Sequence, residues 1–275
     1  MKVFITGQNG FIAKHLSKHF DTVAYSDPAV PILKSLSDFG PDYIFHLGAE
    51  LHDNSKMFST NLGLTVDILE YCRENKETVK KCIIFGSSSE YGRKNGQIKE
   101  TDSLDPVTIY EGTKGAASLL AQSWSKTYDL PVTLIRPFTV YGPDEKPNKL
   151  TQIIKDRYET GKPLYLGPGV HDYIYVEDFV GAIIKIVNFR ESQPFNIVNV
   201  GSGVQTSNED FIRATQRVTG QTLSVVLTDS KQIYDSESWV CDTTILSNKY
   251  HFTSSFSLED GLRRTFHLEI DESNY

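Results

Sequence analysis

The strongest constraint on the fold of this 275-residue chain is a regular alternation, in its first half, of short apolar runs and stretches with helical periodicity. The apolar runs read KVFITG, TVAYSD, DYIFHLG, KCIIFG and PVTLIRPF. Among them lie the amphipathic stretches FIAKHLSKHF, FSTNLGLTVDILEYCREN and YEGTKGAASLLAQSWSKTY. Continuous apolar strands separated by amphipathic helices are typical of a parallel sheet that is covered on both faces. Residues 1–142 are therefore predicted to form an α/β, doubly wound parallel sheet.

The second half has a looser pattern, which predicts a small lobe beside the sheet. PNKLTQIIKDRYETG is typical of a helix that ends at Gly161, and VEDFVGAIIKIVNF is typical of another helix. The buried-strand pattern FNIVNVGSG then predicts that the chain returns to the main sheet at about residues 180–205. We therefore divide the chain into residues 1–142 and a mixed C-terminal lobe, residues 143–275.

Composition narrows the classes of partner. The net charge is −7 and the basic residues are scattered, which argues against a nucleic-acid partner. No run reaches the roughly 20 apolar residues of a membrane span, and MKVFITG begins directly in a strand pattern, so we expect a cytoplasmic protein that does not contact a membrane. The three cysteines are not spaced like metal ligands, so we expect reduced packing residues and no metal site.

A glycine-rich turn joins the first predicted strand to the first predicted helix. In GQNGFIA, Gly7 and Gly10 occupy the first two glycine positions of a GxxGxxG loop, and Ala13 replaces the third. Glycines let backbone amides and a helix N-terminus approach a pyrophosphate closely. The turn therefore predicts a Rossmann-type dinucleotide-binding region in residues 1–142.

Asp27 lies at the end of the second predicted strand. A carboxylate at this place suits hydrogen bonds from a ribose diol and repels a 2′-phosphate. No arginine is near it in the sequence, so NAD is favoured as the cofactor, while NADP remains possible. The alternative is a solvated turn aspartate before Pro28.

Tyr110 and Lys114 are four residues apart at the start of an Ala-rich helical stretch. This spacing places both side chains on one helix face, where an ammonium stabilises a phenolate. The pair predicts an acid–base centre, although such a pair is also common as two exposed helix neighbours.

Several segments in a fixed order resemble the extended short-chain dehydrogenase/reductase family, in particular its sugar-nucleotide epimerases, dehydratases and reductases. The segments are GQNGFIA (7–13), HLGAE (46–50), NLGLTVDILE (61–70), GSSSEYG (86–92), YEGTK (110–114), RPFTVYGP (136–143), HDYIYVEDF (171–179), NVGSG (199–203) and SLEDGLRRTF (257–266).

The resemblance implies a role for particular residues. Tyr110 corresponds to the catalytic tyrosine, Lys114 to the lysine that lowers its pKa and holds the nicotinamide ribose, and Ser87 to the hydroxyl that hydrogen-bonds the reacting oxygen. Asn61 corresponds to the asparagine that supports the lysine through water. The other cofactor-binding positions are Gly7, Gly10, Phe11, Ile12, Asp27, Leu47, Gly48, Ala49 and Pro137. The implied substrate-binding positions are Ser88, Ser89, Glu90, Thr139 and His171.

The resemblance implies a reaction that interconverts a hydroxyl and a ketone on a nucleotide sugar, as a 4-epimerase or a 4-keto-6-deoxy-sugar reductase. Dehydratases of the family carry Asp and Glu where this chain has Ser88 and Ser89, and Glu90 comes one place later, so a dehydratase is an alternative. A reductase of a non-nucleotide carbonyl compound and a non-catalytic dinucleotide sensor are further alternatives.

Two departures from the family concern the substrate phosphates. His171 stands where relatives have a diphosphate-binding arginine, and a second arginine is missing from SKQIYDSESWVCDTT. Thr139 also replaces a frequent asparagine. Lys149, Arg157 and Lys231 are the candidates to compensate.

The resemblance also implies a homodimer formed through the helices that carry Asn61 and Tyr110, with Leu64, Ile68, Leu119 and Leu120 as candidate contacts. The segment after Asp27 is short and leaves little room for the extra strand and helix of most relatives, so we expect an open adenine pocket and modest cofactor affinity.

Overall fold

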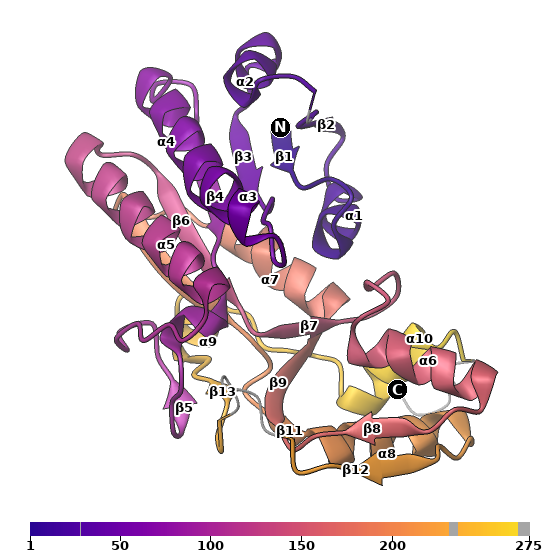
Figure 1. Ribbon diagram of the computed structural model, residues 1–275. Helices are drawn as coiled ribbons and strands as arrows, with labels where there is room; N and C mark the ends of the chain where they lie inside the picture. Colours follow the sequence, from indigo (N-terminus) through magenta and orange to yellow (C-terminus); the bar gives the residue numbers. More distant parts are fainter. Residues whose placement is uncertain (28, 231–235, 269–275) are drawn as a thin grey trace.

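A parallel sheet forms the centre of the computed structural model, which describes residues 1–27, 29–230 and 236–268 (Figure 1). Its six strands have the order β10-β6-β4-β3-β1-β2, and each neighbouring pair is parallel. The strands are β1 (Lys2–Thr6), β2 (Thr22–Tyr25), β3 (Tyr43–His46), β4 (Lys81–Phe85), β6 (Val132–Pro137) and β10 (Phe195–Val200). The predicted doubly wound sheet is confirmed.

Helices cover both faces because alternate residues of each strand point to opposite sides. Phe4, Ile44 and Ile84 belong to one buried cluster, which also includes residues of α2 and α4. Val3 and Phe45 belong to the other, with residues of α1 and α7. The helices are α1 (Phe11–Ser17), α2 (Ile32–Phe39), α4 (Leu64–Glu74), α5 (Ile109–Tyr128) and α7 (Val176–Asn188). Figure 1 shows α4 and α5 side by side, with α7 across the sheet from them.

The short link between β2 and β3 contains helix α2, so the chain has room for a helix there. No further strand lies beyond β2 among the residues that the structure describes. β2 is therefore an edge strand, and this edge is less covered than the centre of the sheet.

The C-terminal lobe consists of short strands and helices packed below the carboxyl end of the sheet (Figure 1). Its elements are β7 (Thr139–Tyr141), α6 (Leu150–Thr160), β8 (Leu164–Leu166), β9 (Val170–Tyr175), β11 (Gln205–Ser207), α8 (Asn208–Thr219), β12 (Val225–Leu227) and α10 (Leu258–Thr265). β9 lies between β7 and β11, and β8 pairs with β12. Two smaller strands, β5 (Gln97–Ile98) and β13 (Val240–Cys241), form a separate pair, and α9 (Thr244–Asn248) follows. Between β9 and β11 the chain returns to the main sheet as α7 and β10.

The predicted helix over residues 58–75 differs from the observed structure. Residues 58–75 are divided into a π-helical segment η1 (Phe58–Gly63) and α4, and α3 (Asn54–Met57) precedes them. The π-helical segment is only six residues long, which is too short for its wider spacing to show in the hydrophobic pattern. π-Helical turns are often found at functional sites, and this one contains Asn61.

Cys72, Cys82 and Cys241 are buried free thiols. No helix in the described residues has the length and apolar character to cross a membrane. Within the same residues, no group of three or more His, Cys, Asp and Glu side chains is arranged to hold a metal ion.

Candidate active site

A cleft of about 1120 Å³ lies between the carboxyl ends of the central strands and the C-terminal lobe. Most of the predicted site residues line it, namely Gly7, Gly10, Phe11, Ile12, Leu47, Gly48, Ala49, Ser87, Ser88, Ser89, Tyr110, Lys114, Pro137, Thr139 and His171. Asn61, Asp27 and Glu90 are not among the lining residues. The topology thus brings together segments that are far apart in the sequence.

The glycine turn after β1 closely approaches the loop after β3. Gly7 has a φ of +74°, and a Cβ added to it would lie 2.9 Å from the backbone of Gly48. The Gly10 N–H donates to the Gly7 carbonyl over 2.8 Å, and α1 begins at the next residue. The turn is therefore compact, and it lines the cleft together with the first residues of α1, an arrangement that suits a pyrophosphate.

The loop after β3 is held by a buried chain of polar groups that the sequence did not reveal. The Thr6 hydroxyl contacts His46 Nδ1 at 2.8 Å and accepts the Gly48 N–H at 2.9 Å, while His46 Nε2 contacts the Thr65 hydroxyl at 3.1 Å. Burial, assisted by the charge of Lys114, lowers the pKa of His46 to about 3. His46 is therefore a neutral link between β1, β3 and α4.

Asp27 is exposed at the end of β2, and its Oδ1 accepts a hydrogen bond from Ala29 N–H over 2.9 Å. The side chain thus closes its own turn, which is the alternative that the sequence left open. The neighbouring Ser26 lines the cleft. Contact between Asp27 and a cofactor ribose remains a proposal.

Ser87 begins a short 3₁₀ turn, η2 (Ser88–Tyr91), directly after β4. Its hydroxyl accepts from the Ser89 N–H, and its own N–H donates to Glu90 over 2.7 Å, which completes a capping box. The Ser87 hydroxyl also lies 2.7 Å from that of Ser89. The hydroxyl is thus fixed at the carboxyl end of a central strand.

Tyr110 lies in the first turn of α5, which a second capping box fixes. Thr108 accepts the Glu111 N–H at 3.2 Å, and the Glu111 carboxylate accepts the Thr108 N–H at 3.0 Å. Burial, followed by the charge of Glu90, raises the pKa of Tyr110 to about 12, and a hydrogen bond with Ser87 opposes the rise. With this pKa the phenol keeps its proton at neutral pH.

Lys114 is buried one turn further along α5. Its Nζ donates to the Phe85 carbonyl at the end of β4 over 2.5 Å. Burial lowers the pKa of Lys114, and the charge of Glu90 opposes this effect. The ammonium, which lies on the same helix as Tyr110, is thus held by a strand carbonyl, and its predicted role in lowering the pKa of that phenol remains a proposal.

Asn61 is buried and joins two elements beside the cleft. Its amide bonds both backbone groups of Glu50, with distances of 2.8 and 3.0 Å, and donates to the Thr113 hydroxyl at 2.9 Å. Thr113 lies next to Lys114 in α5. Asn61 therefore connects the loop after β3 to the helix that carries Tyr110 and Lys114, and support for Lys114 through water remains a proposal.

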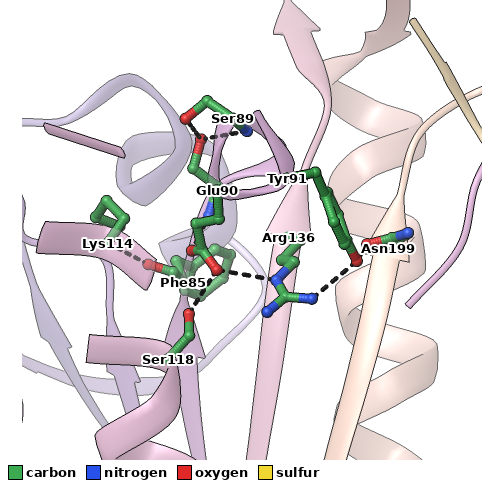
Figure 2. Close-up of polar contacts among 9 residues, drawn as sticks. Phe85, Ser89, Glu90, Tyr91, Lys114, Ser118, Arg136 and Asn199 are labelled. Atoms are coloured by element: carbon green, nitrogen blue, oxygen red, sulfur yellow. Dashed lines mark hydrogen bonds and ion pairs between the residues drawn. The ribbon is translucent and has the colours of Figure 1, made fainter. Parts of the chain in front are cut away.

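The position of Glu90 differs from the predicted contact with the substrate. Its side chain is fully buried, and its Oε2 accepts from Arg136 Nε at 2.9 Å and from the Ser118 hydroxyl at 2.7 Å (Figure 2). The 3₁₀ turn points this carboxylate away from the cleft and into the protein. The preceding Ser88 and Ser89 line the cleft instead.

The wall formed by the C-terminal lobe carries the predicted substrate residues. Thr139 and His171 line it, and Lys149 is an exposed lining residue. Arg157 is not among the lining residues and pairs with Asp156, and Lys231 lies outside the described residues. Of the three candidates to replace the missing arginines, Lys149 is thus the one observed at the cleft.

Sequence reasoning missed Glu145, which also lines this wall. Its carboxylate accepts a hydrogen bond from Thr151. Burial raises the pKa of Glu145 to about 7, and the Thr151 hydroxyl and the charge of Lys149 oppose the rise. Its position after a Gly-Pro turn gave no signal of burial.

Comparison with known proteins agrees with this arrangement. The model of the NAD dependent epimerase/dehydratase family matches residues 3–201. The chain is 25% identical to the uncharacterized UDP-glucose epimerase YtcB of Bacillus subtilis, over 95% of this chain and 96% of that protein. It is 30% identical to a probable dTDP-glucose 4,6-dehydratase of Sinorhizobium fredii, over 66% of this chain and 57% of that protein.

A solved structure, UDP-glucuronic acid 4-epimerase of Bacillus cereus in complex with UDP-glucuronic acid and NAD, is similar in fold. It superposes with a TM-score of 0.86 at 22% identity, covering 97% of this chain and 98% of that one. The family match spans the glycine turn, the serine turn and the Tyr110–Lys114 helix. The chain therefore belongs to the NAD dependent epimerase/dehydratase family.

Proposed function

We propose that the protein is an NAD-dependent 4-epimerase of a nucleotide sugar. The observation that carries this proposal is the convergence of Ser87, Tyr110 and Lys114 on one cleft, beside the glycine turn. The relatives named as acting on UDP-glucose and UDP-glucuronic acid make a UDP-sugar the first substrate class to test.

The chain's own residues suit proton transfer at a sugar hydroxyl. When bound, NAD supplies the hydride acceptor and a positively charged nicotinamide ring. Tyr110 takes the hydroxyl proton, and the Ser87 hydroxyl donates a hydrogen bond to the same sugar oxygen. Lys114 contributes a buried ammonium that favours the phenolate. Because burial and the charge of Glu90 raise the pKa of Tyr110, loss of its proton requires added positive charge, which the nicotinamide ring would supply.

A dehydratase is disfavoured by the residues that follow Ser87. Elimination of water needs an acid and a base in addition to the tyrosine, but Ser88 and Ser89 are hydroxyl residues. Glu90, the nearest carboxylate in this segment, is held in the buried pair with Arg136. A 4-keto-6-deoxy-sugar reductase uses the same residues. A reductase of a non-nucleotide carbonyl compound is also compatible with the site, because such a substrate has no diphosphate and would not need an arginine in place of His171.

The test combines product analysis with a matched pair of variants. Wild-type protein is incubated with NAD and UDP-, GDP-, CDP- and dTDP-sugars, and the products are identified by NMR. We expect C4-epimerised product without net formation of NADH; net oxidation of added NAD(P)H on a keto sugar would point to the reductase instead.

Y110F should lower kcat by about 10²- to 10⁴-fold while NAD binding is retained. Y128F, at the exposed end of the same helix, should have wild-type turnover. Unchanged turnover by Y110F on every accepted substrate would contradict the catalytic assignment.

We also propose a homodimer through the outer faces of α4 and α5. Leu119 is exposed (56%), whereas Ile68 is fully buried in the protein's own core and is unavailable to a partner. L119E should therefore convert a dimer to a monomer in small-angle scattering at micromolar concentration. A wild-type monomer under the same conditions would rule out this pairing.

A further inference from the structure

Glu90 has more partners than a capping residue needs. Capping requires one contact, the Ser87 N–H, which Glu90 Oε1 accepts at 2.7 Å. Its second oxygen accepts from Ser118 in α5 and from Arg136 in β6 (Figure 2). One carboxylate thus joins the turn of the catalytic hydroxyl, the helix of the catalytic phenol and the neighbouring strand.

The packing around this carboxylate is specific to it. A Cβ at Gly86 would lie 2.4 Å from Glu90 Oε1, so the glycine leaves the space that the carboxylate fills. Arg136 extends the cluster, because its NH1 donates to the Tyr91 hydroxyl at 2.8 Å, and Tyr91 donates to Asn199 at 2.8 Å. Burial raises the pKa of Glu90, and the donors around it, Arg136, the Ser118 hydroxyl and the Ser87 N–H, oppose that rise and favour the ionised carboxylate.

The charge of Glu90 acts on both members of the catalytic pair. It raises the pKa of Tyr110 and opposes the fall in the pKa of Lys114. Lys114 is buried, and the nearby His46 is neutral. Glu90 is therefore the counter-charge that the two buried cations Lys114 and Arg136 share, and its loss would leave both without it.

Other groups that bear on the pair differ from Glu90. Glu111 also raises the pKa of Tyr110, but it is a smaller contribution, and Ser87 lowers it. Burial is the largest cause for both residues, and it is unchanged by a substitution that removes charge without removing volume.

We propose that Glu90 is a positioning residue, which fixes Ser87 against α5 and sets the charge balance of the Tyr110–Lys114 pair. Its relevance to turnover rests on the proposed function, whereas its effect on the phenol is a property of the chain alone. The two can therefore be tested separately.

The first test measures the phenol directly, without cofactor or substrate. 3-Fluorotyrosine is placed at position 110, and its titration midpoint is read from the ¹⁹F chemical shift. In E90Q we expect the midpoint to fall by about one pH unit, because a nearby negative charge has been removed. E90D, which keeps the charge but shortens the side chain, should keep the midpoint of the parent.

D178N is the matched control for loss of a buried carboxylate. Asp178 accepts hydrogen bonds from Ser254, Ser255 and Phe256 and lies in α7, outside the cleft lining. D178N should leave the titration midpoint of the phenol at position 110 unchanged. If the amide of E90Q prevents folding, E90M removes the charge at a similar side-chain length without a buried amide, and the midpoint should again fall. An unchanged midpoint in whichever Glu90 variant folds would overturn the proposal.

The second test is the pH profile of kcat on the nucleotide sugar that wild type accepts. Loss of the negative charge lowers the pKa of both Tyr110 and Lys114, so both limbs of the profile should move to lower pH in E90Q. A purely structural role would lower the rate at every pH and leave both limbs in place, which would count against the proposal. If wild type turns over no nucleotide sugar, the proposed function fails while the ¹⁹F result still decides the role of Glu90.

Discussion

On the wall of the cleft that the central sheet builds, the functional groups are fixed by backbone geometry and buried hydrogen bonds, whereas the lobe opposite presents half-buried and exposed side chains. Gly7 packs against the backbone of Gly48, and Lys114 is bound to a strand carbonyl. Across the cleft, Lys149 is exposed and Glu145 is held by one hydroxyl. Groups that perform one reaction need fixed positions, whereas side chains that select a substrate can be replaced by other residue types.

This difference predicts that substitutions on the sheet wall act on cofactor binding and rate, and that substitutions on the lobe wall act on affinity and pH dependence. The comparison would be wrong if substitutions on the lobe wall changed cofactor binding and rate, and substitutions on the sheet wall changed substrate affinity and pH dependence.

The largest effect outside the catalytic pair is expected for G7A. The added Cβ would lie 2.9 Å from Gly48 backbone atoms, and the φ of +74° is unfavourable for alanine. The turn must then move away from the loop after β3, so we expect NAD affinity to fall about 100-fold, or about 2.7 kcal/mol, in calorimetry.

G161A separates the steric effect from the φ effect. Gly161 has a φ of +66° with no atom within 4 Å of an added Cβ, and it ends α6, away from the cleft lining. We expect G161A to impose an unfavourable φ on alanine, as G7A does, but to leave the NAD affinity unchanged. Equal losses of affinity in the two variants would show that the close approach to Gly48 does not matter.

A smaller effect is expected for H171R on the lobe wall. His171 lines the cleft at the position where the resemblance to the family predicts an arginine, and a guanidinium can form bidentate hydrogen bonds with a diphosphate. We expect the KM for the preferred nucleotide sugar to fall about tenfold with kcat unchanged. K155R, which adds an arginine in α6 outside the cleft lining, is the control. A lower kcat with constant KM in H171R would contradict the role of position 171 in substrate binding.

The sheet and the position of the cleft could be predicted from the sequence, because both depend on local patterns. Buried parallel strands are continuous apolar runs, and their carboxyl ends meet at one edge, so the turns of Gly7, Leu47 and Ser87 had to lie close together. The C-terminal lobe is built from strands as short as three residues, such as β7 and β8, which carry little periodicity.

Side-chain directions could not be predicted, since they depend on a single turn. One 3₁₀ turn points Glu90 into the core, and one π-helical turn turns Asn61 toward Glu50 and Thr113. Asp27 bonds its own turn for the same local reason. In each case the sequence indicates a polar residue near the site, but the hydrogen-bond partners of its side chain are set by one or two backbone torsions.

The smallest effect is expected for E145Q, and it concerns pH. The pKa of Glu145 is raised from 4.5 to about 7, so the folded protein binds one more proton than the unfolded chain between these values. The stability that this proton contributes is present below about pH 4.5 and is lost as pH rises to about 7. Since glutamine does not titrate, the unfolding free energy of E145Q relative to wild type should increase by about 1–3 kcal/mol between pH 5 and 8.

Urea unfolding at several pH values measures this difference, and E159Q, at an exposed position of α6, is the control that should follow wild type at every pH. Thr151, Lys149 and the backbone of Gly142 lower the pKa of the Glu145 carboxyl against the effect of burial, and Glu145 in turn raises the pKa of Tyr173. A difference between E145Q and wild type that is constant with pH would mean that the carboxylate is already ionised at pH 5. The lobe wall would then present a fixed negative charge to the substrate, and a uronate would be repelled at every pH instead of only above neutrality.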